Sequence, residues 1–440
     1  MRRPTLAYAY KTPQFVLWGA VSVFITLMPV TAAAKAKTLT SIGEDTLQHQ
    51  AGKKPSGGSL DGVLPSHVSA NPNLRTDFGG VDFYGQVNKS FVGYADGETA
   101  DVGVYDNNIS STRFGFRKSQ NLGNDLFANM LLEVQMNGRS NSRSLTQGAA
   151  GTGASNITER HARVGLGHNK MGVLYIGRTA TASDGITEID IAPLGNAMTS
   201  TPARHGAALE FRAKGTGAKT GIQMSDVIDG FDGIEFAGGS ASDGTNAYGA
   251  GFTDRFDLVR YDSPEVNGFE FSVAVAQAGN RDYALRYNNE FKDLGLEVEA
   301  GVAYVDYRNI TNAAAGSNEV SGQWSGSLSF MSDTGFGGTV AYGRRVYEHR
   351  AAGIDTPQFY YTKLGYSWDG WGVAVEHGNY MHIDTTTAAD THVYTYGVGL
   401  ERDLGQGVGL SVFGRNLDLD RDGLAAKQLY VYGMNLRVKF

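Results

Sequence analysis

The chain has 440 residues, no cysteine and a formal net charge of -7. The lack of cysteine excludes a disulfide framework and a thiolate metal site, and the acidic balance argues against nucleic acid as a partner. The mean hydropathy of -0.26 argues against a helical membrane protein. It does not argue against a transmembrane barrel, whose inner face is polar.

Residues 1–36 have the features of a secretory signal peptide. Two arginines and Lys11 form a positive region, an apolar run extends from Phe15 to Val30, and alanines before residue 37 offer cleavage sites. The run is shorter than the roughly 20 residues that a spanning helix needs, so a signal anchor is the weaker alternative. Residues 37–80 are polar and mixed, and they predict a flexible N-terminal extension.

The last segment of the chain, 429–440, alternates strictly between large apolar residues and small or polar residues. Its apolar set is Tyr430, Tyr432, Met434, Leu436, Val438 and Phe440. Such alternation predicts a strand with one apolar face and one polar face. Because the chain ends on the apolar face with an aromatic residue, we expect that face to meet lipid.

The same alternation recurs from residue 81 to residue 440. The segments with this pattern are 81–94, 110–119, 125–137, 159–168, 171–178, 255–263, 267–278, 281–291, 294–307, 320–331, 335–348, 357–368, 371–381, 391–402, 407–417 and 427–440. We therefore expect an all-β fold, a transmembrane antiparallel β-barrel of about 16 strands, an even number as in single-chain bacterial barrels.

The connections between these segments alternate in length. Every second connection is a short turn rich in Asn, Asp and Gly, and most of the others are longer, with 179–254 the longest. Short turns at one end and long loops at the other are typical of outer-membrane barrels. Lipid offers no hydrogen bonds, so the sheet must close, and we expect 81–94 to pair with 427–440. About 16 strands enclose a water-filled lumen.

The chain from 81 to 440 resembles the general diffusion porins of Gram-negative outer membranes. Four places carry the resemblance: VDFYG at 81–85, ERHARVGLG at 159–167 continuing to Arg178, DLVRYDSP at 257–264 followed by Gly268 and Phe269, and the terminal Phe440. Two features depart from the common pattern. They are the extension before residue 81 and the unusual length of the loop after the fifth strand.

The resemblance implies a homotrimer in the outer membrane, with lipid as a partner and small hydrophilic solutes and ions as cargo. No phosphate loop, nucleophile elbow or paired-carboxylate arrangement stands out in the sequence, so we expect no enzymatic activity, no cofactor and no metal. The resemblance gives Phe440 the role of a barrel-assembly signal, and it implies that 179–254 folds into the lumen as a constriction. An extracellular flap is the alternative for this loop.

Strand parity predicts which charged residues line the lumen. If Phe114, Val164, Tyr175 and Val259 face lipid, the neighbouring arginines face inward, and this basic wall comprises Arg113, Arg117, Arg163, Arg178 and Arg260. The long loop begins with an acidic stretch containing Asp184, Glu188 and Asp190. We expect these acids to lie opposite Arg113, Arg117 and Arg163, which would create a transverse field that favours dipolar solutes. Ordinary surface charge is the alternative.

Two further motifs carry residues that metal ions favour. Asp418–Gly423 begins like a calcium loop, but Leu429 stands where the bidentate Glu belongs, so only weak calcium binding stays open. His377, His382 and His392 lie close in sequence with no helix-based zinc spacing, and we interpret them as scattered surface residues.

The sequence thus favours an outer-membrane porin that forms a water-filled channel for passive diffusion of small hydrophilic solutes and ions. The alternatives are a channel selective for sugars or anions, an outer-membrane barrel enzyme, and a secreted β-rich adhesin. Six aromatic residues near strand ends predict girdles at the membrane interfaces: Tyr360, Trp368, Trp371, Tyr394, Tyr430 and Tyr432.

Overall fold

The computed structural model describes residues 80–137, 141–148, 156–231, 255–276, 280–307, 319–385 and 387–440. The predicted signal peptide, and all of the predicted extension except Gly80, lie outside the described residues. Among the described residues, no helix has the length and apolar character needed to cross a membrane.

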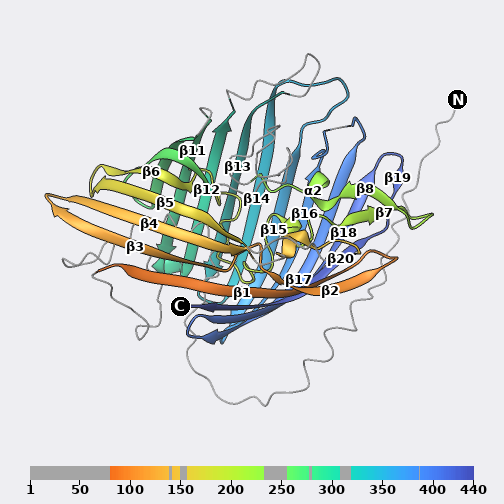
Figure 1. Cartoon of the computed structure of the whole chain (residues 1–440), viewed down its shortest axis with the longest axis horizontal. Helices are drawn as coiled ribbons and strands as arrows, with labels where there is room; N and C mark the ends of the chain where they lie inside the picture. Colours follow the sequence, from red (N-terminus) through yellow and green to blue (C-terminus); the bar gives the residue numbers. More distant parts are fainter. Residues whose placement is uncertain are drawn as a thin grey trace. The chain divides into compact units, whose positions relative to one another are not determined.

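Antiparallel strands make up most of the described chain (Figure 1). The long strands are β1 (Asp82–Ala95), β3 (Arg113–Gly123), β4 (Leu126–Asn137), β5 (Asn156–His168), β6 (Gly172–Ala180), β9 (Arg255–Asp262), β10 (Phe269–Ala276), β11 (Arg281–Phe291), β12 (Leu296–Asp306), β13 (Glu319–Ser332), β14 (Phe336–His349), β15 (Gln358–Trp368), β16 (Trp371–Met381), β17 (Thr391–Gly405), β18 (Val408–Arg421) and β20 (Leu429–Lys439).

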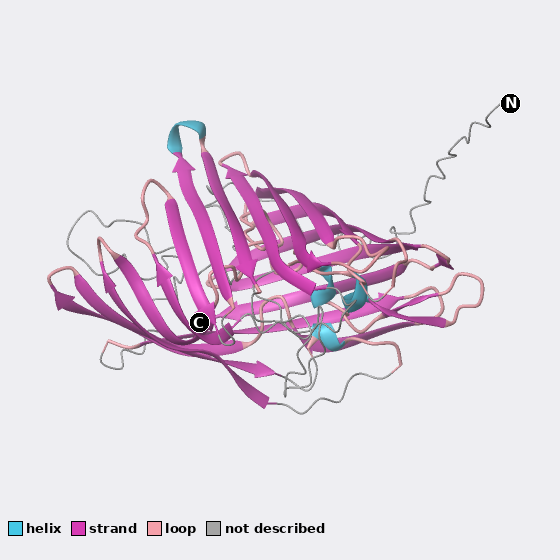
Figure 2. Ribbon diagram, turned by 90° about the horizontal axis from the view of Figure 1, so that it is seen from above, coloured by secondary structure: helices cyan, strands magenta, loops and turns pink. Residues whose placement is uncertain are grey.

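Shorter elements lie in the connections. They are the strands β2 (Ala100–Asp106), β7 (Glu210–Arg212), β8 (Lys219–Gln223) and β19 (Leu424–Ala425), the helix α2 (Met224–Val227), and the 3-10 turns η4 (Ser142–Ser144), η5 (Pro202–Arg204) and η7 (Lys292–Leu294). Figure 2 shows that the helical segments are few and short beside the strands.

The sheet closes on itself through its first and last strands. Sixteen strands follow one another as antiparallel neighbours, and β1 pairs with β20 over ten residue pairs from Gln86–Lys439 to Ala95–Tyr430. Gly85 and Phe440 add two backbone hydrogen bonds, of 2.9 and 3.0 Å. The predicted 16-strand antiparallel barrel, closed between its two ends, is therefore confirmed.

Apolar side chains cover the outer face of the barrel and polar side chains cover the inner face. Val164 and Leu166 of β5 are 61% and 57% exposed, and similar residues recur on the other strands. The positions that alternate with the exposed apolar residues carry buried polar side chains, such as Gln86 and Asn88 of β1 and Ser272 of β10. In water this pattern would leave an extended apolar surface exposed, whereas in a bilayer it places apolar groups against lipid.

The second strand of the barrel is interrupted, which the sequence reading did not foresee. Strands β2 and β3 both pair with β1, at residues 89–95 and 82–86 respectively. The expectation of a loop over 95–109 is wrong for 100–106, which form a strand after a tight turn. Residues 107–112 leave the sheet between β2 and β3 because the Asn107 side chain accepts the backbone N–H groups of Ile109 and Ser110.

The long connection after β6 runs along the inner face of the barrel from β9 to β20. Its described part, 181–231, forms hydrogen bonds with side chains of many of these strands, and the partners include Arg260, Arg286, Ser327, Arg345, Lys363, Tyr380, Arg415 and Arg437. All of these partners have their side chains on the inner face. The segment is thereby held against the wall by contacts spread over most of its length.

Candidate pore lining and constriction

A charged cluster covers the inner face where β3, β4 and β5 meet. Glu133 of β4 is its centre: Tyr84 donates a hydrogen bond of 2.9 Å to it, Arg160 approaches to 2.6 Å, and the Arg113 Nε lies 3.6 Å away. Arg117 lies 3.5 Å from Asp82 and above the ring of Tyr84. Parity therefore placed Arg113 and Arg117 on the correct face.

Arg163 and Arg178 lie on opposite faces of the wall. The Arg163 guanidinium stands 4.0 Å above the ring of Tyr175, and both side chains belong to the inner face. On β6, Leu174 and Ile176 are 45% and 54% exposed, whereas Tyr175 is only 9% exposed. Arg178 shares the parity of Leu174 and Ile176.

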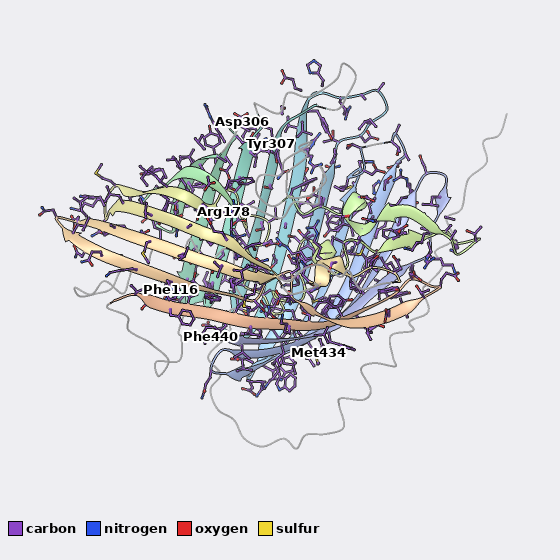
Figure 3. The ribbon with its side chains drawn as sticks, viewed as in Figure 1. Phe116, Arg178, Asp306, Tyr307, Met434 and Phe440 are labelled. Carbon is purple, nitrogen blue, oxygen red and sulfur yellow. The ribbon has the colours of Figure 1, made fainter. Side chains whose placement is uncertain are left out.

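The prediction that Arg178 faces the lumen is therefore wrong, as is the outward placement of Tyr175. Arg178 lies near the long-loop end of β6 (Figure 3), where its Nε donates a hydrogen bond of 3.3 Å to the Glu159 carbonyl. Residues 173–176 are four consecutive apolar side chains, so alternation cannot be read from them. Tyr175 points inward because Gly165 on β5 leaves room for its ring and Arg163 stacks on it.

Arg260 lies on the inner face as predicted, but it holds the beginning of the long connection rather than standing free. It is almost fully buried, donates a hydrogen bond of 2.7 Å to Asp262, and donates another of 2.9 Å to the carbonyl of Thr181. Arg286 acts in the same way, with bonds of 2.7 Å to the carbonyls of Ala182 and Asp184. These two guanidinium groups fix the direction in which the chain leaves β6.

The three predicted acids have different surroundings. Asp184 is buried with Arg255 at 3.8 Å, and Asp190 is buried in an ion pair with Lys363. The Glu188 Oε1 accepts a hydrogen bond of 2.9 Å from Arg204, which lies within the same connection. These acids thus pair with Arg255, Lys363 and Arg204.

Glu188 and Asp190 also border a pocket between the long connection and the segment that interrupts the second strand. The pocket is narrow and opens to solvent. Its lining comprises Ile109, Ser110, Thr187, Glu188, Asp190, Gly195, Asn196, Met198, Thr199, Ser200, Thr339 and Tyr361. The Asn107 side chain donates a hydrogen bond of 3.1 Å to the Asn196 carbonyl, so the two sides of the pocket are tied together at one end.

A third segment, 141–148, also packs on the long connection. The Ser142 hydroxyl donates a hydrogen bond of 3.0 Å to the carbonyl of Arg204, and the Ser142 carbonyl accepts one of 2.8 Å from Gly206 N. Gln147 exchanges bonds of 2.6 and 3.0 Å with the backbone of Glu210. Three connections therefore meet on the inner side of the wall.

An apolar core joins the long connection to the strands beneath it. Residues between Leu194 and Phe231 pack with inward residues of β14 to β20, including Phe359, Tyr380 and Phe413. At about 25 cal/mol per Å² of buried apolar surface, such a core stabilises the fold of this segment substantially. Beneath the loop the inner face therefore offers apolar packing beside the polar contacts of Arg345, Lys363 and Arg415.

His205 belongs to this core and is an unusual member. Its ring is fully buried and stacks on Phe413 with a centroid distance of 4.8 Å. Burial, together with the nearby Arg415 and Arg204, lowers its pKa to about 3. The imidazole is therefore neutral at neutral pH, and charging it within this site is costly.

One ion pair joins the long connection to the turn between β1 and β2. Asp96 lies between β1 and β2 and accepts a hydrogen bond of 2.8 Å from Arg212 of β7. Burial raises the pKa of this carboxyl, but hydrogen bonds from Thr99, Arg212 and Glu98 offset that effect and lower the pKa to about 2. Asp96 is thus ionised over the whole physiological range.

Comparison with known proteins decides what this barrel is. A model of Gram-negative porins matches residues 62–422, most of the chain. The chain belongs to the Gram-negative porin family. It is therefore a non-enzymatic channel of the outer membrane, and porins of this family are often trimeric.

Solved porin structures resemble the chain only at a distance. The anion-selective porin from Comamonas acidovorans has 15% identity and a TM-score of 0.48, covering 82% of this chain and 99% of its own. OmpF of Salmonella typhi in complex with daunomycin has 13% identity and a TM-score of 0.48, covering 81% and 97%. OmpT of Vibrio cholerae in its trimer form has 14% identity and a TM-score of 0.46, covering 82% and 99%. No curated protein matches the chain by sequence.

Sequence reasoning missed several charged residues of the porin's inner face. Glu133, Arg255 and Arg286 are buried there, and so is Lys363. Strand parity could have found Glu133 and Arg286, because each stands next to a leucine that faces outward, Leu132 or Leu285. The sequence carries no signal for the pairing of Arg255 with Asp184 or of Lys363 with Asp190.

The porin's histidines are less scattered than the sequence reading expected. His382 and His392 flank the β16–β17 connection, and the structure brings them together with Asp390. His377 lies apart from them and stacks on Tyr396 on the outer face. Of the six predicted girdle aromatics, all but Tyr394 are at least 36% exposed.

Proposed function

We propose that this porin conducts small hydrophilic solutes and ions through a passage with a transverse field between inner-face arginines and an acidic long connection. The observation that carries the proposal is the position of Glu188, which borders the pocket shared with Ser110. Ser110 lies three residues before Arg113. One side of the pocket therefore carries the Glu188 carboxylate, and the other side belongs to the segment that continues to Arg113.

The arginines differ in what they offer to a solute. Arg260 is almost fully buried and donates to backbone carbonyls, so we assign it an anchoring role. Arg117 and Arg163 are half-buried and retain some exposed surface, whereas Arg113 is buried beside Glu133. We infer that Arg117 and Arg163 provide most of the positive side of the field, and that Arg113 adds to it from beneath.

The three acids of the long connection also differ in how much of their charge a solute can meet. Asp190 is paired with buried Lys363, so its charge is largely neutralised where it lies. Asp184 is buried close to Arg255. Glu188 shares its carboxylate with Arg204 and still lines the pocket, so we infer that it contributes most to the field that a solute meets.

Reversal potentials in planar bilayers test this proposal. We expect Glu188→Gln to shift selectivity towards anions, because it removes negative charge at the passage, and Arg117→Ala to shift it towards cations. The matched control is Arg402→Ala, which removes a charge that stacks on Trp371 near the short-turn rim. Unchanged reversal potentials in both pore variants would eliminate the proposed field.

We also propose that the porin assembles as a homotrimer. The support is the family's common assembly and the extended apolar outer face, part of which a neighbouring copy can cover. Mass photometry of the detergent-solubilised protein should give three times the protomer mass. A protein that remains a monomer at every concentration would contradict this assignment.

A further inference from the structure

Three potential metal ligands meet at the long-loop end of β16 and β17. The Asp390 Oδ1 lies 3.3 Å from the His382 Nδ1 and 3.3 Å from the His392 Nε2. All three ligand atoms lie within 4.8 Å of one another. Neither the porin family nor the proposed passage gives these residues a task.

Backbone hydrogen bonds fix the positions of these three residues. The His382 N–H donates to the Thr391 carbonyl at 2.8 Å, next to both Asp390 and His392. The Asp390 carbonyl accepts a bond of 3.0 Å from the Asp422 N–H of the neighbouring hairpin. The ligands are thus held by the two hairpin ends rather than by a free loop, so ligand binding needs little ordering of the chain.

We propose that His382, Asp390 and His392 form a binding site for a divalent transition-metal ion such as Zn²⁺. Two imidazoles and a carboxylate are a donor set that such ions favour. Ligands about 2.1 Å from a tetrahedral zinc lie about 3.4 Å from one another. The two separations of 3.3 Å therefore already match those of a coordinated ion.

Exposure and charge at this end of the barrel suit an entering cation. The side chains of His382 and His392 are 18% and 25% exposed and that of Asp390 is 56% exposed, so an ion can reach them from solvent. The adjacent hairpin carries Asp420, which pairs across the sheet with His392. Arg421, which pairs across the sheet with Thr391, is occupied by Asp384 at 2.7 Å.

The coordination shell would be completed by water, because the three residues leave at least one position open. The His392 Nδ1 is buried and has no hydrogen-bond partner among the described residues. Ligating histidines usually donate this second nitrogen to a carboxylate or carbonyl, and loss of that contact weakens metal sites 10- to 100-fold. We therefore expect micromolar affinity for Zn²⁺, weaker than that of a buried structural site.

Calorimetric titration with ZnCl₂ tests the proposal on the exported full-length protein. The protein should carry no polyhistidine tag and should be held in detergent at neutral pH without chelators. We expect one Zn²⁺ per chain, and at least tenfold weaker binding in the double variant H382N/H392N. Titration with Co²⁺ should give the visible absorption of a low-coordinate ion in the wild type only.

Two controls separate loss of the site from loss of the fold. His168→Asn alters a histidine at the opposite, short-turn end, where His168 accepts a bond from Lys170 N. This variant should bind Zn²⁺ as the wild type does, and Asp390→Asn should bind less tightly. The proposal is overturned if wild type and H382N/H392N, both folded by circular dichroism, bind Zn²⁺ equally. Because binding is measured without a bilayer, the result is independent of the proposed passage.

Discussion

Asp190 of the long connection and Lys363 of β15 form a buried ion pair, although 173 positions separate them in the sequence. Asp190 also accepts hydrogen bonds from Thr339 of β14 and from the backbone of Ala192. This carboxylate therefore joins the connection to two neighbouring strands. The Asp190–Lys363 pair is therefore a main attachment of the segment that borders the pocket.

Removing the lysine alone should be more damaging than removing both charges. Lys363→Met leaves a buried carboxylate without its cation, which costs about 3–5 kcal/mol. In the double variant D190N/K363M no charge is stranded, and we expect most of that loss to be recovered. Urea unfolding in detergent, followed by tryptophan fluorescence, measures both. Equal losses in the single and double variants would contradict the stranded-charge argument, and no loss in either variant would show that the pair does not anchor the connection.

Closure of the barrel should depend on a glycine opposite the last residue. A Cβ on Gly85 would lie 2.7 Å from the Phe440 ring and 2.8 Å from the Arg113 carbonyl, and backbone cannot yield as a side-chain end can. We expect Gly85→Val to reduce the yield of folded barrel at least several-fold, seen as loss of the heat-modifiable band on gels. Gly409→Ala is the control, because a Cβ there meets open space. Equal yields of folded barrel would contradict the closure argument.

Acid should loosen the packing around His205. Its folded pKa of about 3 lies below the ordinary value near 6.5, so the unfolded chain takes up the proton first. Stability from this group is therefore full above about pH 6.5 and falls as the pH is lowered towards 3. Between pH 7 and pH 5 the loss amounts to about 2 kcal/mol.

His205→Phe should lack this part of the pH dependence, because a phenyl ring can stack on Phe413 and takes up no proton. The comparison is the difference in unfolding free energy between pH 7 and pH 5, measured for the wild type and for the variant. Other titrating groups contribute equally to both proteins. An identical difference in the two would remove His205 as the acid-sensitive group.

The segment that interrupts the second strand should limit current through the passage. Asn107 holds it in place by donating to Asn196 O and Asn435 Oδ1 and by accepting from the backbone of Ile109. We expect Asn107→Ala to cost about 2–3 kcal/mol, since buried partners lose their bonds. Single-channel recordings should then show more frequent current fluctuations. Gln120→Ala, at the exposed short-turn end of β3, should leave the recordings unchanged.

Alternation along the chain was enough to predict sixteen strands, their antiparallel order and the inward side of Arg113, Arg117, Arg163 and Arg260. A period of two is a local property of the sequence. A polar residue between two apolar ones therefore identifies the face of the strand that points away from lipid. The lack of hydrogen-bond partners in lipid likewise predicted that the last strand closes on the first.

Only the tertiary structure decided which charges meet and which face Arg178 takes. Residues 173–176 are apolar throughout, so the side of β6 depended on the fit of Tyr175 between Gly165 and Arg163. The partners of Asp184 and Asp190 are Arg255 and Lys363, on strands far along the chain. The meeting of His382, Asp390 and His392 depends on how two hairpin ends hydrogen-bond. Contacts of this kind arise from packing between distant segments, and no local pattern encodes them.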